Sequence, residues 1–209
     1  MIFDRTGLHF NIPDRDIIQI GDERSIISTD INYKLHQYKL STQTVSRISV
    51  EQLLRIESSD ANFIVTIENK QLRSDAIQYI NKKFWNQISV IMENCSIMPD
   101  VVVGIGTVIF PLNVILSKTT VGNNVLIYPA CAIGHKVTIG SNTLIQSGSF
   151  VGGSTVIGDN CQVGLKSTIA TYINLPANST IGGFSSLTKS PTSLGVFVGT
   201  PARKINQSS

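Results

Sequence analysis

Large aliphatic residues recur every six residues through the second half of the chain. An α-helix, with about 3.6 residues per turn, would spread such a period around its whole surface. Short strands separated by sharp corners can place every sixth residue on the same side of the chain. From position 97 to position 187 every sixth residue is Ile, Val or Leu: Ile97, Val103, Ile109, Ile115, Val121, Ile127, Ile133, Ile139, Ile145, Val151, Ile157, Val163, Ile169, Leu175, Ile181 and Leu187.

This period predicts a mainly β fold, a parallel β-helix built from triangular coils. Three of the six-residue repeats, or hexads, make one coil, so five coils fit between positions 97 and 186. The aliphatic residue points inward, and Gly, Asn or Asp at the corner tolerates a positive φ. The fifth position of each hexad is mostly small or β-branched, which also fits a tight interior. A β-sandwich is the alternative, but its turns recur about every 8–12 residues and lose the six-residue phase.

The first part of the chain lacks this period and carries more charge. Its pattern predicts short strands that alternate with helices, which is typical of a small α/β unit. We therefore expect two domains, residues 1–92 and residues 93–209. The expected elements of the first domain are strands at 16–20 and 37–40, a short helix capped by Ser49, a strand at 62–67, a helix at 71–82 and a strand at 87–92.

Composition narrows the classes of function. The formal net charge of +3 over 209 residues, with no run of five basic residues, argues against nucleic-acid binding. No stretch approaches 18 apolar residues, and residues 1–16 lack the features of a signal peptide, so we expect a cytoplasmic protein that does not insert into membranes. The three cysteines form no CxxC pair, and thus predict neither a disulfide framework nor a thiolate zinc site.

Two stretches carry a family resemblance. Residues 121–169 (VGNNVLIYPACAIGHKVTIG and onward) and 196–205 (VFVGTPARKI) resemble the sialic acid O-acetyltransferases and bacterial amino-sugar N-acetyltransferases. The resemblance covers roughly the C-terminal half of the chain. It implies a left-handed coil direction, a homotrimer with active sites between neighbouring helices, and acetyl-CoA as acyl donor. It also implies a Rossmann-like N-terminal domain that binds a nucleotide sugar, although residues 1–92 lack the family's Gly-rich loop.

His135 is the candidate catalytic residue. The chain has three histidines, His9, His36 and His135, and only the last lies in the repeat. One imidazole cannot form the three-histidine zinc site of a hydratase, so we expect no metal. Acetyl transfer needs a single base that titrates near neutral pH and a donor for the developing oxyanion. The family's catalytic histidine falls in an equivalent hexad. The alternative is a purely structural role, in which a histidine at a corner fills space at the trimer interface.

One full coil after His135 stands Gly153, which would leave room beside the imidazole and present its amide to the thioester oxygen. In the family an acidic residue commonly follows the histidine and orients it, whereas Lys136 stands there in this chain. The orienting group is then a backbone carbonyl or a carboxylate from elsewhere, such as Asp159.

The donor and acceptor sites are placed by the same resemblance. The groove for the pantetheine arm is expected along Gly152, Gly153, Gly164 and Ser167. The expected phosphate ligands are Lys166, Arg203 and Lys204, each of which has a surface charge as its alternative. Within FIVTIENKQLR the expected acceptor ligands are Asn69 and Arg73; here the alternative is a capped helix with a solvated charged face. Cys131 and Cys161 are expected as small core residues.

These observations predict an acetyl-CoA-dependent acetyltransferase. Its acceptor is expected to be a sugar or nucleotide-linked amino sugar used in surface glycan and lipopolysaccharide biosynthesis, acetylated by direct attack with His135 as general base. Two alternatives stay open: acetylation of a different small acceptor, and a non-catalytic trimeric scaffold or sugar-binding protein that keeps only the β-helix.

Overall fold

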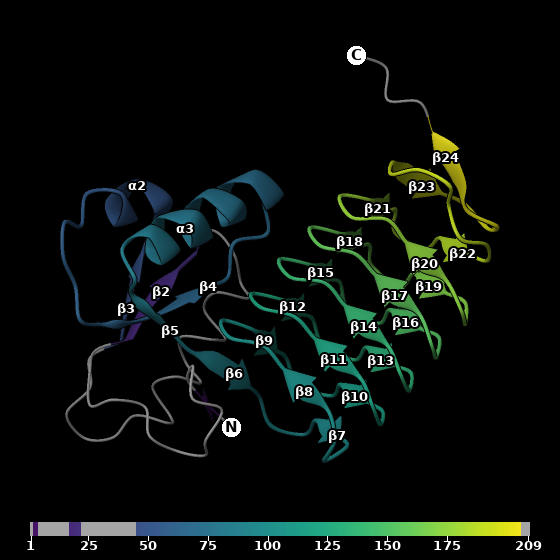
Figure 1. Ribbon diagram of the computed structural model, residues 1–209, viewed down its shortest axis with the longest axis horizontal. Helices are drawn as coiled ribbons and strands as arrows, with labels where there is room; N and C mark the ends of the chain where they lie inside the picture. The colour runs from purple at the N-terminus through teal and green to yellow at the C-terminus, as the bar shows by residue number, and fades with distance from the viewer. Residues whose placement is uncertain (1, 4–16, 22–44, 206–209) are drawn as a thin grey trace. The chain divides into compact units, whose positions relative to one another are not determined.

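The computed structural model describes residues 2–3, 17–21 and 45–205 of the chain (Figure 1). The chain divides into two compact units, Met1–Val90 and Ile91–Ser209. No helix in the described ranges is long and apolar enough to cross a membrane. The expected strand at residues 37–40, His9 and His36 lie outside the described residues.

The second unit is a parallel β-helix with three faces (Figure 1). Face one consists of β7 (Ser96–Ile97), β10 (Val114–Ile115), β13 (Ala132–Ile133), β16 (Phe150–Val151), β19 (Thr168–Ile169) and β22 (Ser186–Leu187). Face two consists of β8 (Val102–Val103), β11 (Thr120–Val121), β14 (Thr138–Ile139), β17 (Val156–Ile157) and β20 (Asn174–Leu175). Face three contains β9 (Val108–Ile109), β12 (Leu126–Ile127), β15 (Leu144–Ile145), β18 (Gln162–Val163) and β21 (Thr180–Ile181).

Each strand pairs in parallel with the strand that lies three hexads further along the chain; for example, Val114 pairs with Ala132 and Ala132 with Phe150. The predicted coil length is thereby confirmed. After β22 the regular path ends. Strand β23 (Val196–Val198) pairs with β21, and β24 (Arg203–Ile205) folds back antiparallel onto β23, which finishes face three.

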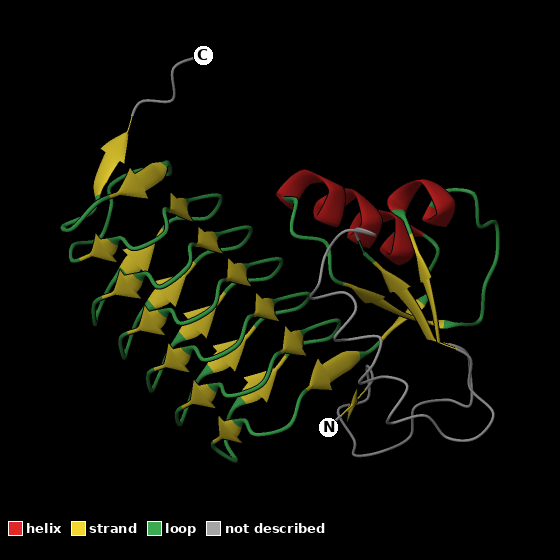
Figure 2. Cartoon of the chain, turned by 180° about the vertical axis from the view of Figure 1, so that it is seen from behind, coloured by secondary structure: helices red, strands yellow, loops and turns green. Residues whose placement is uncertain are grey.

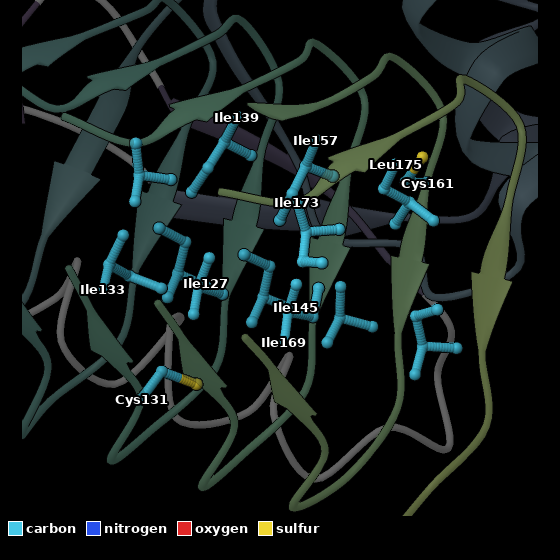
Figure 3. Packing of buried hydrophobic residues seen from close by; sticks show 14 of the residues in the cluster. Ile127, Cys131, Ile133, Ile139, Ile145, Ile157, Cys161, Ile169, Ile173 and Leu175 are labelled. Atoms are coloured by element: carbon cyan, nitrogen blue, oxygen red, sulfur yellow. The ribbon is translucent and has the colours of Figure 1, made fainter. Parts of the chain in front are cut away.

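The core of this unit is the predicted column of aliphatic side chains (Figure 3). From Ile109 to Leu187 these residues are at most 2% exposed, and Ile97 and Val103 in the first coil pack against the same cluster. Each buried aliphatic side chain stabilises the fold by roughly 1.5–3 kcal/mol. Cys131 and Cys161 are buried in the cluster, as predicted.

Where the fifth position of a hexad is Ser or Thr, its side chain usually bridges neighbouring coils. Several of its hydroxyls donate to a backbone carbonyl 15 residues later: Thr119 to Gly134, Thr143 to Gly158, Ser149 to Gly164, Thr155 to Ala170 and Ser167 to Gly182. A larger side chain would lose this bond and overfill the interior.

The corners differ in part from the expectation. The left-handed residue is the third after each aliphatic residue, and it is usually not glycine: φ lies between 51° and 65° at Leu112, Lys118, Asn124, Ala130, Lys136, Asn142, Ser154, Asn160, Lys166, Tyr172, Asn178 and Phe184. The glycine that directly follows the aliphatic residue serves close packing instead. A Cβ on Gly134 would lie 2.6 Å from the backbone nitrogen of Gly153 in the next coil.

The first unit is a small α/β fold. Its parallel sheet has the order β3 (Val45–Ile48), β2 (Ile17–Ile20), β4 (Asn62–Val65) and β5 (Asn86–Gln87). Helices α2 (Val50–Leu53) and α3 (Lys70–Lys82) lie on one side of it (Figure 2). Strand β1 (Ile2–Phe3) pairs antiparallel with β6 (Ser89–Ile91).

The predicted elements of this unit fall close to the observed ones. Ser49 caps α2 and forms a capping box with Gln52, because each side chain binds the other residue's backbone amide. The expected strand at 87–92 divides into β5 and β6, and β3 was not expected. The rings of Phe63 and Trp85 stack in the core beneath the helices, with their centroids 4.8 Å apart.

Candidate functional site

His135 lies at the corner between faces one and two, which we call the His135 corner: residues 117–118, 135–136, 153–154 and 171–172 of four consecutive coils. Both neighbouring coils fix its backbone. The carbonyl of His135 accepts from the Ser154 amide at 2.8 Å, and the amide of Lys136 donates to Ser117 at 2.9 Å. The side chain of His135 is exposed.

The imidazole lies directly against Gly153, as the spacing of one full coil predicted. A Cβ on Gly153 would be 2.9 Å from Nε2 and 3.0 Å from Cε1 of His135, closer than any real side chain is found. The space that the glycine leaves is therefore taken by the imidazole itself, and is not an open channel. The amide of Gly153 donates no hydrogen bond to any residue that the structure describes, whereas its carbonyl accepts from Tyr172 at 3.1 Å.

No carboxylate of the described chain orients His135. Asp159 lies at a different corner, between faces two and three, where its Oδ1 accepts from the Ser141 amide at 2.6 Å. Neither ring nitrogen of His135 hydrogen-bonds to a described residue, and Lys136 beside it is exposed. Among the described residues, no group of His, Cys, Asp and Glu side chains gathers to hold a metal ion.

The expected donor-binding residues fall at two corners. Gly152 and Gly153 are buried at the His135 corner, while Gly164, Lys166 and Ser167 lie at the corner between faces three and one, which we call the Lys166 corner. Face one joins the two corners. The amides of Gly152 and Gly164 donate to Ile169 and Ile181 in the next coil, so of the three candidate glycines only Gly153 has a spare amide.

Ser167 does not fit the groove that it was expected to line. Its side chain is fully buried, and its hydroxyl donates to the Gly182 carbonyl at 2.7 Å. It belongs to the inward fifth-position series, and a ligand would reach it only by breaking the bond between coils.

The three candidate phosphate ligands are all exposed. Lys166 Nζ lies 5.9 Å from the ring centroid of Phe184, an aromatic side chain that is 66% exposed. Lys204 Nζ donates to Ser193 Oγ at 3.0 Å, and Arg203 Nη1 donates to the neighbouring Ala202 carbonyl at 3.2 Å. Phe184 was missed in the sequence, although a large aromatic residue one full coil after Lys166 was a visible signal.

The candidate acceptor residues have structural partners. Asn69 is the N-cap of α3, and its Oδ1 accepts from the Leu72 amide at 3.0 Å. Arg73 is only 1% exposed, and its Nη1 donates to the carbonyls of Ile67 and Glu68 at 3.0 and 3.2 Å. Arg73 is therefore not a solvated charge; it links the carbonyls of the loop between β4 and α3, and its role as an acceptor ligand stays a prediction.

Comparison with known proteins identifies the repeat. Residues 118–153 match the family model of the bacterial transferase hexapeptide, described as six repeats. The repeat is thus similar to the transferase hexapeptide over these residues. The predicted fold, a left-handed β-helix of hexapeptide repeats, is thereby confirmed. A search of curated proteins gives no significant sequence match.

Solved structures share the whole fold. The acetyltransferase domain of PglB from Neisseria gonorrhoeae is 14% identical, with a TM-score of 0.80 over 90% of this chain and 99% of that chain. PerB from Caulobacter crescentus, solved with CoA and GDP-perosamine, is 14% identical, with a TM-score of 0.78 over 91% of this chain and 97% of that one. WeeI from Acinetobacter baumannii is 15% identical, with a TM-score of 0.53 over 90% of this chain and 99% of that chain. The resemblance to amino-sugar acetyltransferases is confirmed in repeat and fold.

Proposed function

We propose that this protein is an acetyl-CoA-dependent acetyltransferase that acts on a hydroxyl or amino group of a sugar or nucleotide-linked amino sugar. One observation carries the proposal: an exposed imidazole, His135, lies against Gly153, whose amide donates to no described residue, at a corner of a helix that matches the transferase hexapeptide. The similar folds of PglB and PerB, an acetyltransferase domain and a protein solved with CoA and GDP-perosamine, support it.

The chemistry needs only these two groups. When bound, acetyl-CoA supplies an acyl group on a thioester. His135 accepts the proton of the attacking hydroxyl or amine as the new C–O or C–N bond forms, and returns it to the CoA sulfur as the C–S bond breaks. The Gly153 amide donates to the carbonyl oxygen while negative charge develops there. A general base contributes roughly 10²–10⁴-fold, and one such amide roughly 10²–10³-fold.

The donor is proposed to lie along face one, between the two corners that flank it. The pantetheine arm would run past the exposed imidazole of His135 and the amide of Gly153, and Lys166, Arg203 and Lys204 would bind the phosphates. Gly152 and Gly164 lie against backbone of the next coil, and would support the groove from beneath without opening it. Face one also carries exposed apolar side chains, with Val114 39% and Phe150 48% exposed. Such side chains support contact with a second copy of the chain, and so the proposed homotrimer.

The acceptor is proposed to bind to the first unit, residues 1–92. Strand order in its sheet reverses between β2 and β4, and ligands of parallel α/β sheets bind outside the carboxyl ends of the strands at such a point. Asn69 and Arg73 would shape the loop that follows β4. We place the reaction in the cytoplasm, in the synthesis of surface glycans such as lipopolysaccharide.

The test is thiol release from acetyl-CoA by the full-length protein, against nucleotide-linked amino sugars and free sialic-type sugars, with mass spectrometry of the products. We expect acceptor-dependent release and an acceptor that gains one acetyl group. A protein that neither binds acetyl-CoA nor releases thiol with any acceptor would refute the proposal in favour of a non-catalytic scaffold.

A further inference from the structure

Two lysines flank the candidate base at the His135 corner. Lys118 and Lys136 are exposed and occupy the left-handed position of consecutive coils, with φ of 60° and 55°. Adjacent coils are spaced like neighbouring strands, about 4.8 Å apart. Lys136 follows His135 directly, and its amide bonds to the Ser117 carbonyl beside Lys118. The corner thus presents two cationic side chains close to the imidazole.

The backbone does not require lysine at these positions. At the corner between faces two and three, the same left-handed position is filled by Gly106, Asn124, Asn142, Asn160 and Asn178. Asn and Gly tolerate this conformation best, whereas other L-residues cost roughly 1–2 kcal/mol there. Leu112, Ala130 and Phe184 take the same conformation at the corner between faces three and one, so the backbone neither requires nor excludes lysine at positions 118 and 136.

Neither lysine is neutralised within the described chain. No ion pair joins Lys118 or Lys136 to a described residue. Asp100 lies in the coil before this corner, one coil from Lys118 and two from Lys136, and its Oδ2 accepts from the backbone amide of Lys118 at 3.1 Å. Asp159 is engaged at another corner. The ammonium groups of both lysines are left for a ligand.

The phosphates of CoA do not fit this place. If His135 acts at the thioester, the whole pantetheine arm separates the CoA diphosphate from the His135 corner. The anion has to come from the other substrate. Resting on the proposed function, we infer that the acetyl acceptor carries a carboxylate or phosphate near the atom that is acetylated, and that Lys118 and Lys136 bind this group.

Binding of matched acceptor pairs tests this inference. The imidazole resonances of His135, assigned with His135→Ala, are followed during titration with N-acetylneuraminic acid against its methyl ester, and with glucosamine 6-phosphate against glucosamine. Wild type should bind the charged member of at least one pair about 10-fold more tightly, since charge-assisted contacts of this kind are strong. The pair that responds distinguishes a carboxylate from a phosphate.

Three variants remove one charge each. Lys118→Asn and Lys136→Asn keep a residue that tolerates the left-handed φ, and each should reduce the preference to about 3-fold or less. Lys189→Asn is the control, because Lys189 is an exposed lysine three coil lengths beyond His135 along the chain, farther than the Debye length of about 8–10 Å. It should keep the full preference.

Equal affinity for both members of both pairs, no binding of any of the four sugars, or a preference that both variants retain would overturn the inference. Acetyl-CoA affinity and acetyl transfer are measured on the same samples. A neutral sugar acetylated as well as its charged partner would leave the proposed function standing and remove this inference. Failure to bind acetyl-CoA would remove the proposed function, whatever the sugar titrations show.

Discussion

Replacing Gly153 with alanine tests the geometry of the site. The added Cβ would lie 2.9 Å from Nε2, 3.0 Å from Cε1 and 3.2 Å from Cδ2 of His135. Because carbon atoms pack at about 3.5–4.0 Å, the imidazole has to move by roughly 0.5–1 Å. A misplacement of about 1 Å costs on the order of 10²-fold in rate. We therefore expect kcat to fall roughly 10- to 100-fold.

Stability should change little in this variant, since the clash is with the end of an exposed side chain and not with backbone. Substitutions of that kind usually stay within about 0.5 kcal/mol. The assay is thiol release at saturating acetyl-CoA and acceptor, with thermal unfolding and acetyl-CoA affinity measured in parallel.

Gly183→Ala is the matched control, because Gly183 has the same place in its hexad and its added Cβ would meet only ordinary contacts, the nearest at 3.5 Å. This variant should keep wild-type kcat. If Gly153→Ala also stays within about 2-fold of wild type while folded, the position of the imidazole does not matter and the reasoning is refuted.

Three further predictions concern stability and reactivity. Gly134→Ala should lower the free energy of unfolding by about 1–3 kcal/mol, because its Cβ would meet backbone of the next coil; an unchanged melting temperature would contradict the packing role. Arg73→Met should cost about 1–3 kcal/mol in chemical denaturation, because two loop carbonyls lose their donor, and should leave acetyl-CoA affinity unchanged; a loss of acceptor affinity at wild-type stability would instead make Arg73 a ligand. Burial raises the pKa of Cys131 to about 11 from 9.0, so its thiol should resist alkylation at pH 8 until the protein is denatured. The unfolded state releases this proton first, so the thiol's stabilising contribution is intact below pH 9 and falls as the pH rises toward 11; rapid native alkylation would disprove this burial.

The repeat was predictable because every coil contains the same number of residues, so residues one coil apart in the sequence lie side by side. A coil of constant length, three hexads, placed His135 against Gly153 by counting alone, and the structure agrees. The same counting assigns Ser167 to the inward fifth position, together with Ser149 and Thr155, so its burial follows from the sequence, whereas the family resemblance points to the donor groove.

Other features depend on tertiary contacts that have no period. A charged residue such as Arg73 is normally solvated, and its burial follows from two loop carbonyls that only the folded β4–α3 connection brings together. The sequence also did not predict which residue of each corner takes the positive φ. Glycine is most frequent directly after the aliphatic position, which suggested that this residue takes the positive φ. Those glycines are instead required by close packing between coils, as Gly134 shows. The positive φ is taken by residues as large as Tyr172.

The central claim is that His135 is the base for acetyl transfer, and the most direct measurement is kcat for His135→Ala against wild type with an acceptor identified by thiol release. The account predicts a fall of roughly 10²–10⁴-fold, with acetyl-CoA affinity and melting temperature near wild type because the side chain is exposed. Equal kcat for the two proteins would contradict it.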